Sequence, residues 1–304
     1  MMRDFVERHF RHFNAGELRR CVESLRDFSA DGGRLMITLA GAMSTAEIGR
    51  SLAPIIRAGK IHAICCTGAN LEEDLFHLVA ASHYGDVPDW RDLSPNEESQ
   101  LKNRITNRTI PEEKAIRKVE SQLISLWKDT AGRLPHEFLY DLVKNVEVDA
   151  DPQDSWLLAA AECNLPLFVP GWEDSTLGNI FAARVIEGVV DIDAVLGGTH
   201  YMLGLADWVR EHPNNGFLQV GGGIAGDFPI CVVPMLRQDL GEDVPLWAWF
   251  AQISESRPSY GGYSGAPPNE KISWEKLGVE TPKFVIESDA TIVLPILLSC
   301  LLDE

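Results

Sequence analysis

The sequence is poor in cysteine, in long apolar runs and in positive charge. Its six cysteines include no Cys-x-x-Cys pair, so neither a disulfide framework nor a zinc site is indicated. The longest apolar run, Ala290–Leu302, contains Pro295 and falls short of the roughly 20 residues that cross a bilayer, which favours a buried helix. The net charge of -18 repels nucleic-acid backbones and anionic lipid. We therefore expect neither nucleic acid nor a membrane as partner, whereas cationic amines would be attracted.

The remaining composition is that of a folded globular protein. Its 304 residues are 45% hydrophobic and 24% charged, which allows one large core or two ordinary domains. The N-terminal segment Met1–Phe10 stays charged and lacks the apolar centre of a signal peptide. Together with the few cysteines, this predicts a protein of the reducing cytoplasm.

Short apolar runs rich in β-branched residues alternate with longer helical patterns. This alternation predicts an α/β fold with a mostly parallel sheet covered by helices on both faces. The runs expected to form strands are Leu35–Leu39, Ile61–Cys66, Pro166–Val169, Phe217–Val220, Leu246–Ile253 and Phe284–Ile286.

Helical patterns fill much of the sequence between these strands. They are expected around residues 116–126, 155–161 and 182–190, besides the buried helix at 290–302. The polar stretch Gly85–Pro111 has few core residues and predicts a surface excursion. The simplest division is a helical N-terminal extension over residues 1–33 and a single large α/β domain over residues 34–304.

Small and polar residues follow the first two predicted strands. In a parallel sheet, ligands bind where such loops gather at the carboxyl ends of the strands. Ser44 or Thr45 could cap the next helix and leave backbone amides free for a phosphate. Thr67–Asn70 and the acids Glu72–Asp74 follow the second strand. These acids either belong to a ligand site or complement the positive end of a helix dipole.

Two later strands also end in turns that could bind a ligand. Gly221–Gly226 satisfies the dinucleotide pattern G-x-G-x-x-G, but it lies far from the N-terminal strand that usually carries this fingerprint. Its glycines would still let the backbone approach a ligand closely. Asp174 could accept hydrogen bonds from a ribose or a cation, or cap a helix beside Ser175.

Lys276 is the candidate nucleophile. A lysine attacks carbonyl or imine carbons only as the free amine, so a site that uses it must lower its pKa by burial or by a neighbouring cation. Trp274 could form part of a dry wall, and Tyr260 and Tyr263 could form a cation-binding wall. The alternative is a helix start with Trp274 in the core and Lys276 in water.

Five spaced segments together resemble the deoxyhypusine synthase family. The segments are Thr-Gly-Ala-Asn-Leu-Glu-Glu-Asp at 67–74, Asp-Ser-Thr-Leu-Gly at 174–178, Gly-Gly-Gly at 221–223, Ser-Gly-Ala-x-Pro-x-Glu-x-x-Ser-Trp-x-Lys at 264–276 and Ser-Asp-Ala at 288–290. The resemblance runs from Arg34 to Leu302 and implies a Rossmann-like fold.

The resemblance also implies an activity and a set of site residues. Members of the family are NAD-dependent transferases that oxidise spermidine to an imine, pass its aminobutyl group to a lysine and then to an acceptor amine, and return the hydride. Lys276 falls on the position of that lysine. The amine-site positions are Glu72, Glu73, Asn179, Asp227, Tyr263, Glu270 and Trp274. The NAD-site positions are Met43, Ser44, Thr45, Ala46, Glu47, Thr67, Gly68, Ala69, Asp174, Gly222, Glu255, Ser256, Asp289 and Ala290.

The departures from the family pattern concern the substrate. Asn179, Tyr260 and Tyr263 stand where the family has aspartates, and Asp227 replaces a histidine of the amine site. A guanidinium stacks well on an aromatic face, whereas a compact ammonium prefers a carboxylate, so agmatine or putrescine is a candidate substrate.

The acceptor also differs among family members. Eukaryotic and archaeal members modify a protein lysine, while some bacterial relatives use a small diamine and make homospermidine. The short segment before Arg34 contains no evident protein-docking element, which favours a small diamine here. The alternatives are a protein acceptor or a homologue that binds NAD without turnover. The resemblance further implies a homotetramer with active sites at dimer interfaces. No metal is expected, because His9 and His12 are one helical turn apart but have no further ligand nearby in the sequence.

Overall fold

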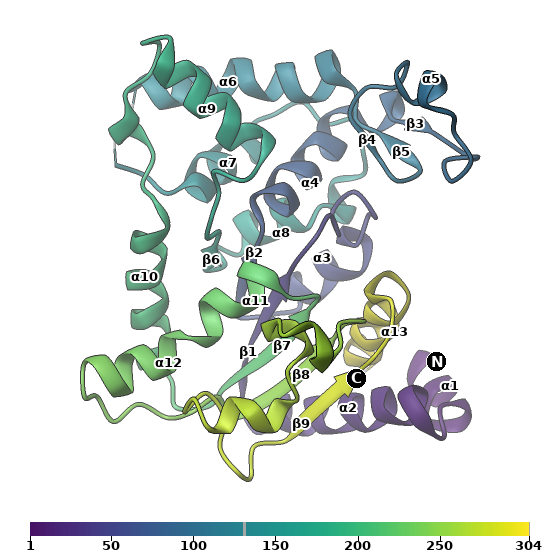
Figure 1. Ribbon diagram of the computed structural model, residues 1–304, viewed down its shortest axis with the longest axis vertical. Coiled ribbons are helices and arrows are strands. Elements are labelled where there is room, and N and C mark those ends of the chain that lie inside the picture. The colour runs from purple at the N-terminus through teal and green to yellow at the C-terminus, as the bar shows by residue number, and fades with distance from the viewer. Residues whose placement is uncertain (130–131, 304) are drawn as a thin grey trace.

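A six-stranded parallel sheet forms the centre of the protein (Figure 1). The structure is a computed structural model that describes residues 1–129 and 132–303. The strands lie side by side in the order β6-β2-β1-β7-β8-β9. Their bounds are Arg34–Leu39 for β1, Ala63–Cys66 for β2, Leu167–Phe168 for β6, Asn215–Val220 for β7, Trp249–Ile253 for β8 and Lys283–Ile286 for β9. Every neighbouring pair in this sheet is parallel, and each strand coincides with a predicted run.

Helices cover both faces of this sheet, as predicted. Successive residues of a strand point to opposite faces. On β7, Gly216 leaves room for the ring of Phe28, whereas the ring of Phe217 contacts Trp247, which in turn lies against Trp208. Phe28 belongs to α2 and Trp208 to α10, so these helices lie on opposite faces. Apolar residues on both faces explain why the strands read as continuous hydrophobic runs.

The principal helices include the four predicted from sequence patterns, one of them with a different extent. Their bounds are Met2–His9 for α1, Phe13–Ala30 for α2, Gly49–Arg57 for α3, Gly68–Ala80 for α4, Arg117–Asp129 for α6, Pro135–Val143 for α7, Trp156–Glu162 for α8, Thr176–Ile186 for α9, Gly198–Arg210 for α10, Gly223–Ile230 for α11, Val232–Pro234 for α12 and Ala290–Leu302 for α13. Helix α9 was expected at 182–190, but Ser175 caps it and a left-handed Gly188 follows its end.

The N-terminal helices pack directly on the sheet. In α2, the ring of Phe28 stacks on Trp249 of β8, and Ser24 accepts a hydrogen bond from the Trp249 indole at 3.1 Å. Helix α2 also contacts β9 and α13. It ends just before the predicted boundary at residue 33, and the division into extension and domain stays a prediction.

The polar stretch from 85 to 111 forms its own small sheet. Strands β3 (Gly85–Asp86), β5 (Arg108–Thr109) and β4 (Arg104–Ile105) pair antiparallel, with the short helix α5 (Pro95–Glu98) beside them (Figure 1). Within residues 1–129 and 132–303, no helix is long and apolar enough to cross a membrane. The same residues contain no group of three or more His, Cys, Asp and Glu side chains suited to a metal ion.

The order of the strands creates a natural ligand position. Numbered along the chain within this sheet, the strands lie in the order 3-2-1-4-5-6, which is that of dinucleotide-binding α/β folds. In such sheets the crossover direction reverses between the first and fourth strands, and ligands bind beyond their carboxyl ends. Here those strands are β1 and β7, and the turn Gly221–Gly223 directly follows β7.

Candidate active site

One cavity of about 620 Å³ gathers Lys276 with four residues of the predicted amine site. These four are Asp227, Tyr263, Glu270 and Trp274. They come from α11 and from the long segment between β8 and β9. We refer to this cavity as the lysine pocket.

Lys276 is buried although the neighbouring tryptophan is not. Only 8% of Lys276 is exposed, whereas 59% of Trp274 is exposed, with its ring centroid 5.8 Å from Lys276 Nζ. The alternative of a helix start with a core tryptophan and a solvated lysine is wrong. The segment contains the short 3-10 turn Pro268–Ile272 and then a turn in which Glu275 has a positive φ of 53°. This turn directs Lys276 inward.

The amine of Lys276 lies near a carboxylate and a thiol. Its Nζ is 3.8 Å from Oδ1 of Asp227, and the thiol of Cys231 donates to the same oxygen at 3.6 Å. Burial raises the pKa of Cys231. The thiol therefore stays neutral, and the carboxylate of Asp227 is the anion that pairs with Lys276.

A second lysine lies in the same pocket, and sequence reasoning did not single it out. Lys271 is 2% exposed, and its ammonium donates to the carbonyl of Ala266 at 3.3 Å. Its Nζ is 4.7 Å from the ring centroid of Tyr263, and Nζ of Lys276 is 5.1 Å from the same centroid. Tyr263 thus contacts both lysine ammonium groups, whereas Tyr260 is exposed, and the cation-binding wall stays a prediction. Burial and the charge of Lys276 lower the pKa of Lys271 to about 8.

The lysine pocket adjoins the glycine turn after β7. The hydroxyl of Tyr263 donates to Gln219 at 2.7 Å, and the amide of Gln219 donates to the Gly221 carbonyl at 3.0 Å. Ser264 accepts a hydrogen bond from the backbone N–H of Gly223 at 3.1 Å. A Cβ on Gly222 would lie 1.5 Å from Ser264 Oγ, so this close approach requires glycine.

The other predicted amine-site residues line a separate cavity of about 380 Å³. This acidic pocket contains Glu72, Glu73 and Asn179, together with Arg104, Glu112 and Arg117. The structure therefore divides the predicted amine site between two pockets of one chain. The Asn179 amide donates to the carbonyls of Glu173 and Ser175, which fixes its side chain at the start of α9.

The acids of α4 bind other segments and do not complement the dipole of their own helix. Glu72 accepts hydrogen bonds from the backbone N–H groups of Thr176 and Leu177 at 2.8 and 2.7 Å, which caps α9. Asp74 accepts from the N–H groups of Trp156 and Leu157 and so caps α8. The dipole alternative is wrong, because these acids lie beyond the first turn of α4.

Glu73 connects α4 to the loop after β1. Its Oε2 accepts hydrogen bonds from the Thr45 hydroxyl at 2.7 Å and from the Thr45 N–H at 3.3 Å. Burial raises the pKa of Glu73 to about 7, and these hydrogen bonds oppose the shift only in part. Near neutral pH this carboxyl group therefore exists in both protonation states.

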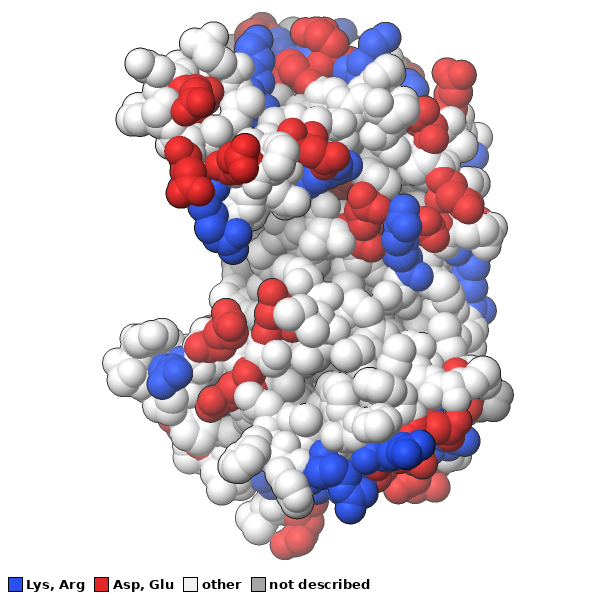
Figure 2. Space-filling view, turned by 90° about the vertical axis from the view of Figure 1, so that its right-hand side faces the viewer, with Lys and Arg blue, Asp and Glu red and all other residues white. Residues whose placement is uncertain are grey.

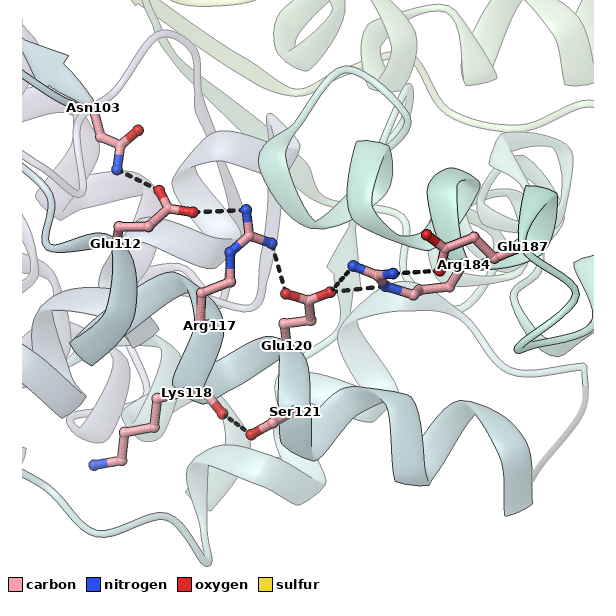
Figure 3. Close-up of polar contacts among 8 residues, drawn as sticks. All are labelled: Asn103, Glu112, Arg117, Lys118, Glu120, Ser121, Arg184 and Glu187. Atoms are coloured by element: carbon pink, nitrogen blue, oxygen red, sulfur yellow. Dashed lines mark hydrogen bonds and ion pairs between the residues drawn. The ribbon is translucent and has the colours of Figure 1, made fainter.

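A chain of ion pairs begins at Glu112 and Arg117, which line the acidic pocket, and extends away from it (Figure 3). Arg117 joins Glu112 at 2.6 Å and Glu120 at 2.7 Å, and Arg184 joins Glu120 at 2.8 Å and also bonds Glu187. Burial would raise the pKa of Glu120, but the two guanidinium groups outweigh it and hold the pKa below its ordinary value. This network joins α6 to α9.

The polar groups of the loop after β1 are hydrogen-bonded to side chains of α4 and α8. Ser44 donates from its N–H to Asn70 at 3.0 Å, and its hydroxyl accepts a hydrogen bond from the Trp156 indole at 2.9 Å. Neither Ser44 nor Thr45 caps α3, which begins at Gly49 with no side-chain cap. The predicted capping role is wrong, because Ser44 and Thr45 instead form hydrogen bonds with side chains of α4 and α8.

Other predicted cofactor residues lie on the loops that follow the strands or in the first turns of α4 and α13. Ser175 caps α9, so the alternative capping role of Asp174 is wrong, and Asp174 remains exposed. Asp289 caps α13 by accepting from the N–H of Thr291. Thr67 caps α4, and Gly68 lies so close to Ser175 that a Cβ there would clash. The remaining positions are Met43, Ala46, Glu47, Ala69, Glu255, Ser256 and Ala290, and Glu47 pairs with Arg50 at 3.0 Å.

The molecular surface is recessed about half-way down its long axis (Figure 2). Acidic side chains lie on both sides of this recess in the view shown. Basic side chains also occur there, so the negative net charge is spread over a mixed surface.

Comparison with known proteins identifies the family. A model of the deoxyhypusine synthase family matches residues 6–301. The chain belongs to the deoxyhypusine synthase family. The deoxyhypusine synthase-like proteins of Thermosynechococcus vestitus and of a Cyanothece species are 30% and 29% identical over 99% of this chain, covering 78% and 79% of their own lengths.

The fold of the deoxyhypusine synthase family is also found among solved structures. A protein of Entamoeba histolytica proposed to be a deoxyhypusine synthase superposes with a TM-score of 0.60 at 13% identity, covering 98% of this chain and 91% of that one. This similarity supports the fold. The Rossmann-like prediction made from the sequence motifs is confirmed.

The main residues that sequence reasoning missed are Lys271, Cys231 and Gln219. Lys271 and Cys231 line the lysine pocket, and Gln219 links it to the glycine turn. The signal for Lys271 was its place inside the lysine segment itself, since two lysines occur there within six residues. Cys231 and Gln219 carried no local signal.

Proposed function

We propose that the protein is an NAD-dependent transferase that moves an aminobutyl or guanidinobutyl group from a polyamine, through an imine on Lys276, to a small diamine acceptor. The observation that carries this proposal is the buried amine of Lys276 in a cavity that adjoins the Gly221–Gly223 turn. A nucleophilic lysine needs such a water-poor site.

The residues at the carboxyl edge of the sheet fit a dinucleotide. The glycine turn stands at the point where the strand order reverses, and Gly222 has no side chain that could block a ligand there. Asp174 follows β6 and Asp289 follows β9, at opposite edges of the sheet, and their exposed carboxylates would hold ribose hydroxyls. When bound, NAD would supply a hydride acceptor for the donor amine and return the hydride to the product.

The transfer itself would use Lys276. Its free amine forms a bond to the imine carbon of the oxidised donor, and the original carbon–nitrogen bond breaks, which releases the remaining part of the donor as an amine. The acceptor amine then attacks the lysine imine and frees Lys276. Asp227, at 3.8 Å, would take up and return the lysine proton. No water enters this sequence, which is consistent with the burial of Lys276.

The charges of the lysine pocket suit a cationic substrate. Asp227, Asp239 and Glu270 all line it. Tyr263 provides an aromatic face, which a guanidinium group uses better than an ammonium does. This supports agmatine, beside spermidine and putrescine, as a donor or acceptor.

Assembly into a homotetramer is part of the proposal. Lys276 and the acids Glu72 and Glu73 line different pockets of one chain, and Trp274 and Tyr260 are exposed beside the lysine pocket. Dimer formation would cover these rings and bring the two kinds of pocket together. Light scattering of the purified protein in solution tests this assembly.

Product analysis tests the proposed transfer. The protein is incubated with NAD and with spermidine, putrescine and agmatine, singly and in pairs, and products are identified by mass spectrometry. The proposal predicts a homospermidine-like or guanidinated product that Lys276→Ala abolishes. An unchanged product rate in this variant would refute the lysine mechanism. The absence of any new product would favour a protein acceptor or a non-catalytic homologue.

A further inference from the structure

Lys271 and Lys276 are held together by the backbone of one turn. The N–H of Lys276 donates to the carbonyl of Lys271 at 3.0 Å, and the left-handed Glu275 allows the chain to turn between them. Both ammonium groups consequently lie near the ring of Tyr263. That ring is fixed in turn by its hydrogen bond to Gln219.

The surroundings of the two amines differ in charge. Lys276 is near the carboxylate of Asp227, the neutral thiol of Cys231 and the ring of Trp274. An anion next to an ammonium favours the charged form, which cannot act as a nucleophile. A second influence must offset Asp227 if Lys276 is to react near neutral pH.

Lys271 supplies a positive charge without a matching anion. Its neighbours are the Ala266 carbonyl and the rings of Phe250 and Tyr263, with Glu270 and Asp227 acting on it only at longer range. Within residues 1–129 and 132–303, no carboxylate forms an ion pair with it. A buried ammonium in this position repels a second proton on the neighbouring amine.

We propose that Lys271 is a positioning residue that keeps Lys276 reactive, because its buried ammonium, held over the same tyrosine ring, disfavours the charged form of Lys276. This inference rests on the proposed role of Lys276 as nucleophile. The effect operates while Lys271 keeps its own proton, and it fades as the pH rises above about 8, where the pKa of Lys271 lies.

Trace labelling of the lysines with acetic anhydride tests this role, because only neutral amines react. Labelling of the full-length protein is followed from pH 6 to 11, and peptides are quantified by mass spectrometry. The exposed Lys144 serves as reference within each sample. Lys271→Met is predicted to slow labelling of Lys276 about tenfold at neutral pH, where wild-type Lys271 is charged, and to leave it unchanged well above pH 8. Lys271→Arg should keep the wild-type labelling rate at neutral pH, as should Lys102→Met, which removes an exposed charge elsewhere.

Two results would overturn the role of Lys271. One is a Lys276 profile in Lys271→Met that superimposes on that of the wild type. The other is an equal shift in Lys271→Met and Lys271→Arg, which would show an effect of packing and not of charge. If Lys271→Met does not fold, the labelling profile of the wild-type protein tests the coupling instead. Two coupled lysines titrate over a broader pH range than Lys144 does. A simple one-proton profile at Lys276 would contradict the coupling.

The labelling experiment is independent of turnover. It requires neither NAD nor a polyamine, so a failure of the product analysis would leave the labelling result intact. Conversely, unchanged labelling of Lys276 in Lys271→Met would refute the proposed effect of Lys271 on Lys276. Transfer through Lys276 could still be observed in that case.

Discussion

The side chains of Lys276 and Asp227 form an ion pair at 3.8 Å inside the lysine pocket. Lys276 comes from the segment between β8 and β9, and Asp227 from α11. The pair joins the proposed nucleophile to the only carboxylate of α11, directly behind the glycine turn. Loss of Asp227 is therefore expected to raise the reactivity of the Lys276 amine and yet to slow turnover.

Asp227→Asn is expected to separate these two effects. Loss of the anion destabilises the lysine ammonium, so Lys276 should label faster with acetic anhydride at neutral pH. Transfer should nevertheless slow by about 100-fold, because the group that accepts and returns the proton is lost. Asp243→Asn, which removes a fully exposed carboxylate, is the control. Parallel changes in labelling and turnover would contradict the assigned role.

Gly222→Ala is expected to damage the junction between the glycine turn and the lysine segment. The added Cβ would lie 1.5 Å from Ser264 Oγ, and such overpacking costs about 1–3 kcal/mol of stability. NAD affinity, measured by calorimetry, should fall by at least tenfold. Gly198→Ala, where nothing lies within 4 Å of the new Cβ, should leave both quantities unchanged. Unaltered NAD binding in Gly222→Ala would place the dinucleotide elsewhere.

Glu73 should make stability depend on pH. Its pKa is raised by burial from 4.5 to about 7, so the folded protein keeps a proton that the unfolded chain loses between these values. Stability contributed by this proton is present below pH 4.5 and is lost as the pH rises to about 7. Glu73→Gln should match the wild type near pH 5 and be more stable by about 1–3 kcal/mol at pH 8. Urea unfolding at both pH values measures this, and an equal difference at both would contradict it.

The exposed Glu113→Gln serves as the control for that experiment. It changes the same functional group without removing a buried carboxyl. Its stability should follow that of the wild type at both pH values.

Glu120→Ala should weaken the ion-pair network that joins α6 to α9. The substitution leaves the guanidinium groups of Arg117 and Arg184 without their shared partner. We expect a loss of about 1–3 kcal/mol in urea unfolding, below the value for a fully buried pair because both arginines reach solvent. Glu187→Ala, which removes an exposed member of the same network, should cost less than half as much. Equal losses of stability in the two variants would show that the shared position of Glu120 between two arginines contributes no extra stability.

The sheet could be predicted because its strands are buried on both faces. Continuous apolar runs such as Ala63–Cys66 indicate a strand without knowledge of its neighbours. The start of α9 was missed, because it is set by the Ser175 cap and by Glu72, which lies about a hundred residues earlier in the chain. The strand order could not be derived from local patterns, and the resemblance to a known family supplied the expected fold.

The candidate site was predicted less completely than the fold. The lysine segment identified Lys276, Trp274 and Glu270, and the structure brings all three to one pocket. The separation of Glu72 and Glu73 into another pocket depends on tertiary packing that no local spacing shows. Lys271 was missed because a lysine in a polar segment is usually exposed, whereas here its ammonium contacts the Ala266 carbonyl and the rings of Phe250 and Tyr263.

Trapping the lysine imine tests the central claim most directly. The protein is incubated with NAD and each candidate donor, reduced with borohydride, digested and mapped by mass spectrometry. We predict an aminobutyl or guanidinobutyl adduct on Lys276, absent from Lys276→Ala and absent without NAD. A donor that is consumed with steady accumulation of NADH and no adduct on Lys276 would contradict the proposal and indicate a simple dehydrogenase.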